Sequence, residues 1–184
     1  MEDGRKREKA HQIQRAFYST YLKAHGLKFQ SVCLPNGMWG NAWGCSMRHN
    51  DLGLLNLSGL ADDMIQKFAN NGIVLENGSL PALFCDSIYH NTLVLARKIE
   101  NPTDAEELLN ERCNSARQSI ELLYGDLFGL FHLLHYKDKF RLFRKGKEMY
   151  AIIIVCMFLQ NCYTCYYGNK VQSSHCADKV DIDN

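Results

Sequence analysis

Hydrophobic and polar positions along the chain predict a mixture of short strands and helices. Residues 29–34 form a strand-like run, Pro35-Asn36-Gly37 has the residues of a tight turn, and residues 38–45 form a second run. Two such runs joined by a turn predict a β-hairpin. The short apolar run 82–85 follows the chain-breaking residues 78–81 and predicts another strand.

Helical periodicity is strongest after Pro102. Thr103 and Glu106 have the spacing of a capping box, and an acidic first turn suits the positive end of a helix. Shorter helices are predicted from Asn50 or Asp51 to residue 56, and over residues 60–69. In the long helix, apolar residues recur at spacings of three and four: Leu109, Cys113, Ala116, Ile120, Leu123 and Leu127. This stripe predicts a helix packed against a sheet.

Two carboxylates stand at prominent positions in these elements. Asp86 ends the apolar run 82–85, and Glu121 follows after 34 intervening residues, on the flank of the helical stripe. A strand carrying one carboxylate and a helix carrying another can build a two-metal site that cuts phosphodiesters. Asp3 could provide a third carboxylate. Arg117 lies one turn before Glu121 and can brace it, although a surface ion pair is the simpler explanation from this helix alone.

Composition and charge limit the function without fixing it. The chain has 184 residues, of which 46% are apolar and 22% charged, as expected for one globular domain rather than a disordered chain. The net charge of +1 hides segregation: residues 1–28 and 137–148 each carry a net +4, and residues 103–126 carry a net −4. Two basic segments beside an acidic one suit a polyanion held over metal-binding carboxylates. Solvated surfaces without a ligand explain the charges equally well.

The eight cysteines lie largely inside apolar runs, and the N-terminus has no secretory pattern. They are therefore interpreted as reduced intracellular thiols. Cys162 and Cys165 form a CxxC pair, and Cys156, His175 and Cys176 lie nearby. These are zinc-ligand types, but a single pair without a second one is a weak signal, and zinc remains the less favoured alternative.

The apolar run 149–167 is barely long enough to cross a membrane. It contains Gln160, Asn161 and Thr164, which favours a buried helix closed by Gly168 over a membrane span. Gln160 and Asn161 should then find hydrogen-bond partners.

An ordered series of motifs spans roughly residues 3 to 170. It comprises Tyr18 to Gln30, Leu34 to Gly37, Arg48 to Asp51, Leu57 to Leu60, Cys85 to Tyr89, Asn114-x-x-Arg117-x-x-x-Glu121-x-x-Tyr124-Gly125, and Asn161-Cys162-x-x-Cys165-x-Tyr167-Gly168. In order and spacing the series resembles the catalytic domain of PIF/Harbinger-type DDE transposases and their domesticated nuclease relatives.

The resemblance implies an α/β, RNase H-like fold over residues 1–170, with a mixed central sheet flanked by helices, followed by a polar tail at 171–184. It implies that Asp3, Asp86 and Glu121 are catalytic residues that bind Mg²⁺ or Mn²⁺, hard cations that suit oxygen ligands. It also implies DNA as substrate and a nuclear location, with the cytoplasm as a further one. Charge and position make four residues candidates for phosphate contacts: Lys23, Lys28, Arg48 and His49.

The chain departs from the family pattern mainly at its start. Only two residues precede Asp3, so we expect the first strand of the sheet to be missing and the domain to be truncated there. A DNA-reading region, carried upstream or by a partner protein in such transposases, is expected to be supplied separately. Tyr124 replaces the usual Phe, and His90 replaces a common Pro.

Two functions follow from the sequence. The first is a metal-dependent DNA endonuclease of transposase origin, working by phosphodiester hydrolysis or strand transfer. The alternative is a catalytically inactive, transposon-derived module that binds DNA or another protein.

Overall fold

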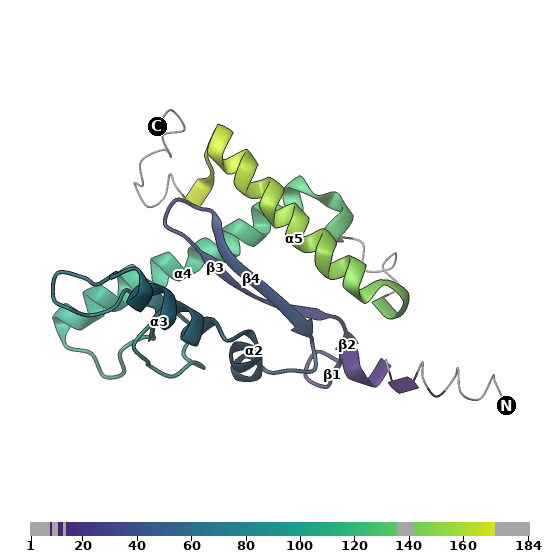
Figure 1. Cartoon of the computed structure of the whole chain (residues 1–184), viewed down its shortest axis with the longest axis horizontal. Coiled ribbons are helices and arrows are strands. Elements are labelled where there is room, and N and C mark those ends of the chain that lie inside the picture. Colours follow the sequence, from purple (N-terminus) through teal and green to yellow (C-terminus); the bar gives the residue numbers. More distant parts are fainter. Residues whose placement is uncertain (1–7, 9–10, 13, 136–141, 172–184) are drawn as a thin grey trace.

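A β-hairpin lies at the centre of the computed structural model, with helices packed along it (Figure 1). The structure describes residues 8, 11–12, 14–135 and 142–171. The elements follow in this order: β1 (Tyr18–Ser19), β2 (Ala24–His25), β3 (Leu27–Cys33), β4 (Trp39–Ser46), α2 (Asp51–Ser58), α3 (Leu60–Asn70), β5 (Leu83–Phe84), β6 (Leu95–Ala96), α4 (Asp104–Leu130), the 3₁₀ helix η1 (His132–His135) and α5 (Leu142–Tyr167).

The predicted hairpin is confirmed as the antiparallel pair β3 and β4. Its turn places Gly37 at φ +73°, in the left-handed region that glycine adopts without strain. A bulge between Val32 and Cys33 shifts the register near the turn. The turn is also held from the far end of the chain, because the Asn169 side chain donates to the Gly37 carbonyl at 2.6 Å.

Alternate residues of β3 point to opposite faces of the hairpin, as the two-residue period of a strand requires. On one face, Phe29 stacks on Tyr150 of α5 with ring centroids 5.7 Å apart, and Ser31 shares a 2.7 Å hydrogen bond with Tyr124 of α4. Tyr124 therefore makes a hydrogen bond that a Phe at this position, which has no hydroxyl, could not make. On the other face, Gln30 donates to Ser58 at the end of α2. The hairpin is thus covered by α4 and α5 on one face and by α2 on the other.

Helix α5 is joined to the hairpin by polar contacts inside the core. The Gln160 side chain accepts from Trp39 Nε1 at 2.8 Å and donates to the Leu123 carbonyl of α4 at 3.0 Å. The Asn161 side chain accepts from the Trp39 amide at 2.8 Å and donates to its carbonyl at 3.0 Å. The prediction that both amides are paired is confirmed, as is the cap at Gly168, whose φ is +72°.

Within the described residues, one helical stretch, Glu148–Tyr167, is long and apolar enough to cross a membrane, with a mean hydropathy of 1.4. One side of this stretch lies in the core, where Cys156 and Met157 pack with Trp39, Leu123 and other residues. The internal-helix prediction is consistent with this packing.

The apolar stripe of α4 is correct in its second half and wrong in its first. Leu123 and Leu127 are fully buried, but Leu109 is 51% exposed and Ala116 is exposed, while polar Asn110 is buried. The first half of α4 lies against the segment before it: the Asn110 side chain accepts from the Ile99 amide at 2.9 Å and donates to its carbonyl at 3.2 Å. Hydrogen bonds from a polar side chain to the backbone therefore help to hold this half. The capping box of Thr103 and Glu106 is confirmed.

The α/β class is confirmed. The described strands pair two by two, as antiparallel β1–β2 and β3–β4 and parallel β5–β6, and these residues form no single mixed central sheet. The strand expected at 82–85 is present as β5. The RNase H-like arrangement remains an expectation, and the expectations for Asp3, a first strand and the 171–184 tail fall wholly or largely outside the described residues.

Candidate functional site

Asp86 lies directly beyond β5, at the end of the parallel pair β5–β6. Cys85 continues the pairing by donating its amide to the Ala96 carbonyl at 2.8 Å, and Asp86 then opens a turn in which its carbonyl accepts from the Tyr89 amide at 3.0 Å. The Asp86 carboxylate also bonds its own neighbour: Oδ1 accepts from the Ser87 amide at 2.7 Å. The strand therefore delivers a carboxylate whose direction is partly fixed by the turn.

Arg117 of α4 pairs with Asp86. Its Nη1 donates to Asp86 Oδ1 at 2.9 Å, and both side chains are about half exposed. In the described part of the chain Arg117 makes this pair and no ion pair with Glu121, so the expected brace between Arg117 and Glu121 is corrected. An i, i+4 pair was suggested by spacing alone, whereas the fold brings a strand-end carboxylate from 31 residues away to the same side chain.

Glu121 lies one helical turn after Arg117 and is exposed. It borders an open groove of about 720 Å³ between α4 and α5, with Gly125, Gly129 and Tyr163 among its neighbours. A side chain added at Gly125 or Gly129 would meet open space, so this face of α4 is open at both glycines. The Glu121 carboxylate is therefore accessible, on the helix that contacts Asp86 through Arg117.

Asp86 and Glu121 have the chemistry of ligands for a hard divalent cation, since both offer accessible carboxylate oxygens. The residues described by the structure contain no group of three His, Cys, Asp or Glu side chains that could hold a metal ion. Asp3, the expected third ligand, lies outside those residues, as do His175 and Cys176 of the weaker zinc alternative. Two of the three expected carboxylates are thus accessible on elements that pack together.

Tyr89 and Cys85 flank Asp86 and stay protonated. Burial, together with the negative charges of Asp51 and Asp86, raises the pKa of Tyr89 to about 12. Burial and the Asp86 charge raise the pKa of the Cys85 thiol, against a lowering by Arg97. At neutral pH Tyr89 is a hydrogen-bond donor rather than a base, and Cys85 is a thiol rather than a nucleophile.

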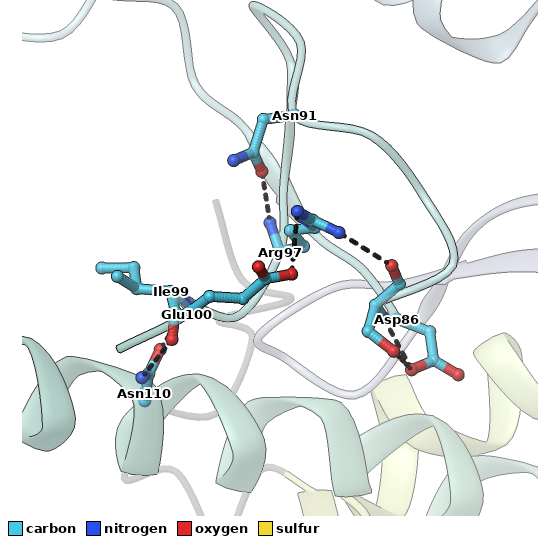
Figure 2. Close-up of polar contacts among 7 residues, drawn as sticks. Asp86, Asn91, Arg97, Ile99, Glu100 and Asn110 are labelled. Atoms are coloured by element: carbon cyan, nitrogen blue, oxygen red, sulfur yellow. Dashed lines mark hydrogen bonds and ion pairs between the residues drawn. The ribbon is translucent and has the colours of Figure 1, made fainter. Parts of the chain in front are cut away.

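The segment after Asp86 is tied to itself and to α4 (Figure 2). Arg97 donates to the Ser87 carbonyl at 3.3 Å and pairs with Glu100 at 3.0 Å, and Asn110 holds Ile99. Sequence reasoning gave no role to Arg97 or Asn110. An Asn among the first turns of a helix is an ordinary surface residue by pattern, and only its burial reveals the contact.

A second groove, of about 990 Å³, brings together three of the four candidate phosphate-binding residues. Lys28, Arg48 and His49 line it, and Ile88, two residues beyond Asp86, lines it too. Lys28 pairs with Asp51 at 2.9 Å, which offsets part of its charge. The fourth candidate, Lys23, does not line this groove; it is exposed in the turn between β1 and β2, at φ +49°. Further groove-lining residues that sequence reasoning did not single out are His11, Arg15 and His25.

Comparison with known proteins identifies the family. A family model described as DDE superfamily endonuclease matches residues 4–161. No curated protein and no solved structure matches the chain. The family model covers most of the chain, including Asp86, Arg117 and Glu121, and the chain therefore belongs to the DDE superfamily of endonucleases.

Proposed function

We propose that this chain is the endonuclease domain of a PIF/Harbinger-type, transposase-derived protein, which cuts or joins DNA phosphodiesters in the nucleus. The observation that carries the proposal is the Asp86–Arg117 ion pair, because it ties the strand-end carboxylate to the helix of Glu121, one turn before that residue. Family membership and the ordered motifs of the sequence support the same assignment.

Asp86 and Glu121, with Asp3, would hold Mg²⁺ or Mn²⁺. Two such cations, when bound, supply activation of the attacking water or 3′ hydroxyl and stabilisation of the leaving oxygen. The chain's own residues prepare the site. Arg117 and the Ser87 amide fix Oδ1 of Asp86, and the neutral phenol of Tyr89 is available as a hydrogen-bond donor.

The basic groove suits the phosphate backbone of DNA. Lys28, Arg48 and His49 are side chains of the type that contacts phosphates, and such contacts set position without reading sequence. Ile88 links the groove to the turn that begins at Asp86, so DNA in the groove would run toward Asp86. Lys23 would contact phosphate outside the groove. Target recognition would fall to a separate DNA-binding partner.

The test is metal-dependent nicking of supercoiled plasmid by the purified chain. The proposal predicts nicking in Mg²⁺ or Mn²⁺ that is lost in Asp86→Ala. Glu111→Ala is the matched control, because Glu111 is an exposed carboxylate on α4 to which we assign no role in the site. Nicking that persists at the native rate in Asp86→Ala would contradict the assignment of the site.

One observation suits the inactive alternative: the groove lined by Lys28, Arg48 and His49 could hold DNA phosphates whether or not a cation site forms. An inactive module would bind DNA through the basic groove without any metal-dependent nicking. A chain that binds DNA, loses that binding when Lys28 and Arg48 are replaced, and leaves plasmid intact in both cations would establish this second function.

A further inference from the structure

The two oxygens of the Asp86 carboxylate have different surroundings. Oδ1 accepts from the Ser87 amide at 2.7 Å, from the Ser87 hydroxyl at 3.4 Å and from Arg117 Nη1 at 2.9 Å. No residue that the structure describes donates a hydrogen bond to Oδ2. One oxygen is thus held by the protein and the other is left to accept a ligand.

Among the described residues, Arg117 provides the one contact to this carboxylate from a distant part of the chain. The Ser87 donors belong to the adjacent residue and move with Asp86, whereas Arg117 is fixed to the core through α4. Leu123 and Leu127 of that helix are fully buried, and Asn110 holds it to Ile99. Arg117 therefore sets where the Asp86 carboxylate lies relative to the helix of Glu121.

We propose that Arg117 is a positioning residue for the cation site: it holds Oδ1 of Asp86 so that Oδ2 is presented as a ligand beside the helical turn of Glu121. This inference rests on the proposed function. Hydrogen bonds that orient a ligating carboxylate typically raise metal affinity by 10- to 100-fold, because less freedom is lost when the ion binds.

A simple counter-ion would have the opposite effect. A guanidinium close to a carboxylate repels a divalent cation, so removing it should tighten cation binding if charge alone mattered. The half-exposed positions of Arg117 and Asp86 make that repulsion weak, since solvent screens it. The sign of the change in affinity on removing Arg117 therefore separates positioning from competition.

The experiment measures Mn²⁺ affinity directly, from the electron paramagnetic resonance signal of free Mn²⁺ titrated with the full chain, without DNA or turnover. Arg117→Gln should bind Mn²⁺ about 10-fold more weakly than the native chain. Arg117→Lys should recover part of the loss, because a lysine can still donate to Oδ1. Arg112→Gln is the matched control: it removes the same charge from an exposed position on α4, away from Asp86, and should leave the affinity unchanged.

Asp86→Ala tests the cation site itself, separately from the positioning role of Arg117. Melting curves by circular dichroism check that each variant is folded. If Asp86→Ala abolishes binding while Arg117→Gln binds as tightly as the native chain or tighter, the positioning role is overturned and the site itself stands. If Asp86→Ala binds Mn²⁺ like the native chain, the proposed function fails and the role of Arg117 fails with it. Equal losses in Arg112→Gln and Arg117→Gln would also overturn positioning, because only general charge would then matter.

Discussion

Replacing Gln160 with Met tests the buried contact that joins the hairpin, α4 and α5. Gln160 is 2% exposed and bonds both Trp39 Nε1, at 2.8 Å, and the Leu123 carbonyl, at 3.0 Å. Met has a similar length and shape, so Gln160→Met removes the hydrogen bonds and leaves no large cavity. It strands the buried indole N–H, which costs about 1–3 kcal/mol. Leu123, as a helix residue, keeps its place in the backbone ladder, so the cost at its carbonyl is the smaller of the two.

The free energy of unfolding from urea denaturation, followed by tryptophan fluorescence, measures this destabilisation. We expect Gln160→Met to lose about 1–3 kcal/mol, a large part of the roughly 5–15 kcal/mol of a typical domain. Gln118→Met, at an exposed position of α4, is the matched control and should change stability by less than about 0.5 kcal/mol. A Gln160→Met protein that unfolds at the native urea midpoint would refute the claim that the hydrogen bonds of Gln160 stabilise the packing of α5 in the core.

Two other predictions concern the basic groove and Tyr89. Replacing Lys28 and Arg48 with Ala should weaken DNA binding and lower the slope of log affinity against log salt by about 1 for each phosphate that the protein no longer neutralises, measured by fluorescence anisotropy. Lys67→Ala, at an exposed position of α3 outside the groove, should leave DNA binding unchanged; an equal effect from it would count against the groove. The phenolate absorbance of Tyr89, assigned with Tyr89→Phe, should appear near pH 12 rather than 10. Because the folded pKa is raised, the neutral phenol stabilises the fold below pH 10, and this contribution is lost as the pH rises from 10 toward 12.

Features set by neighbouring residues could be predicted from the sequence. The hairpin follows from a Pro-Asn-Gly turn between two apolar runs, and the capping box follows from Thr103 and Glu106 three residues apart. Gln160 and Asn161 were expected to be paired because an apolar helix that contains amides must satisfy them. In each case the determining contact is local or is required by burial.

Features set by distant contacts could not be predicted in this way. Leu109 was expected to be buried and is exposed, whereas its neighbour Asn110 is buried. The reason is that the Asn110 side chain, unlike a leucine, can form hydrogen bonds with the backbone at Ile99. Arg117 was predicted to pair with Glu121, one turn away on the same helix, but it pairs with Asp86. The helical period predicts which residues of α4 share a face, but it does not predict which part of the chain packs against that face.

The central claim is that Asp86 and Glu121 act together as ligands of one catalytic cation site. The most direct test compares Mg²⁺-dependent plasmid nicking by Asp86→Asn, Glu121→Gln and the double variant. Carboxylates that serve one site act as a unit, so each single variant should lose nearly all nicking and the double variant should be no worse. Single variants that keep the native rate, or losses that simply multiply in the double variant, would contradict the claim.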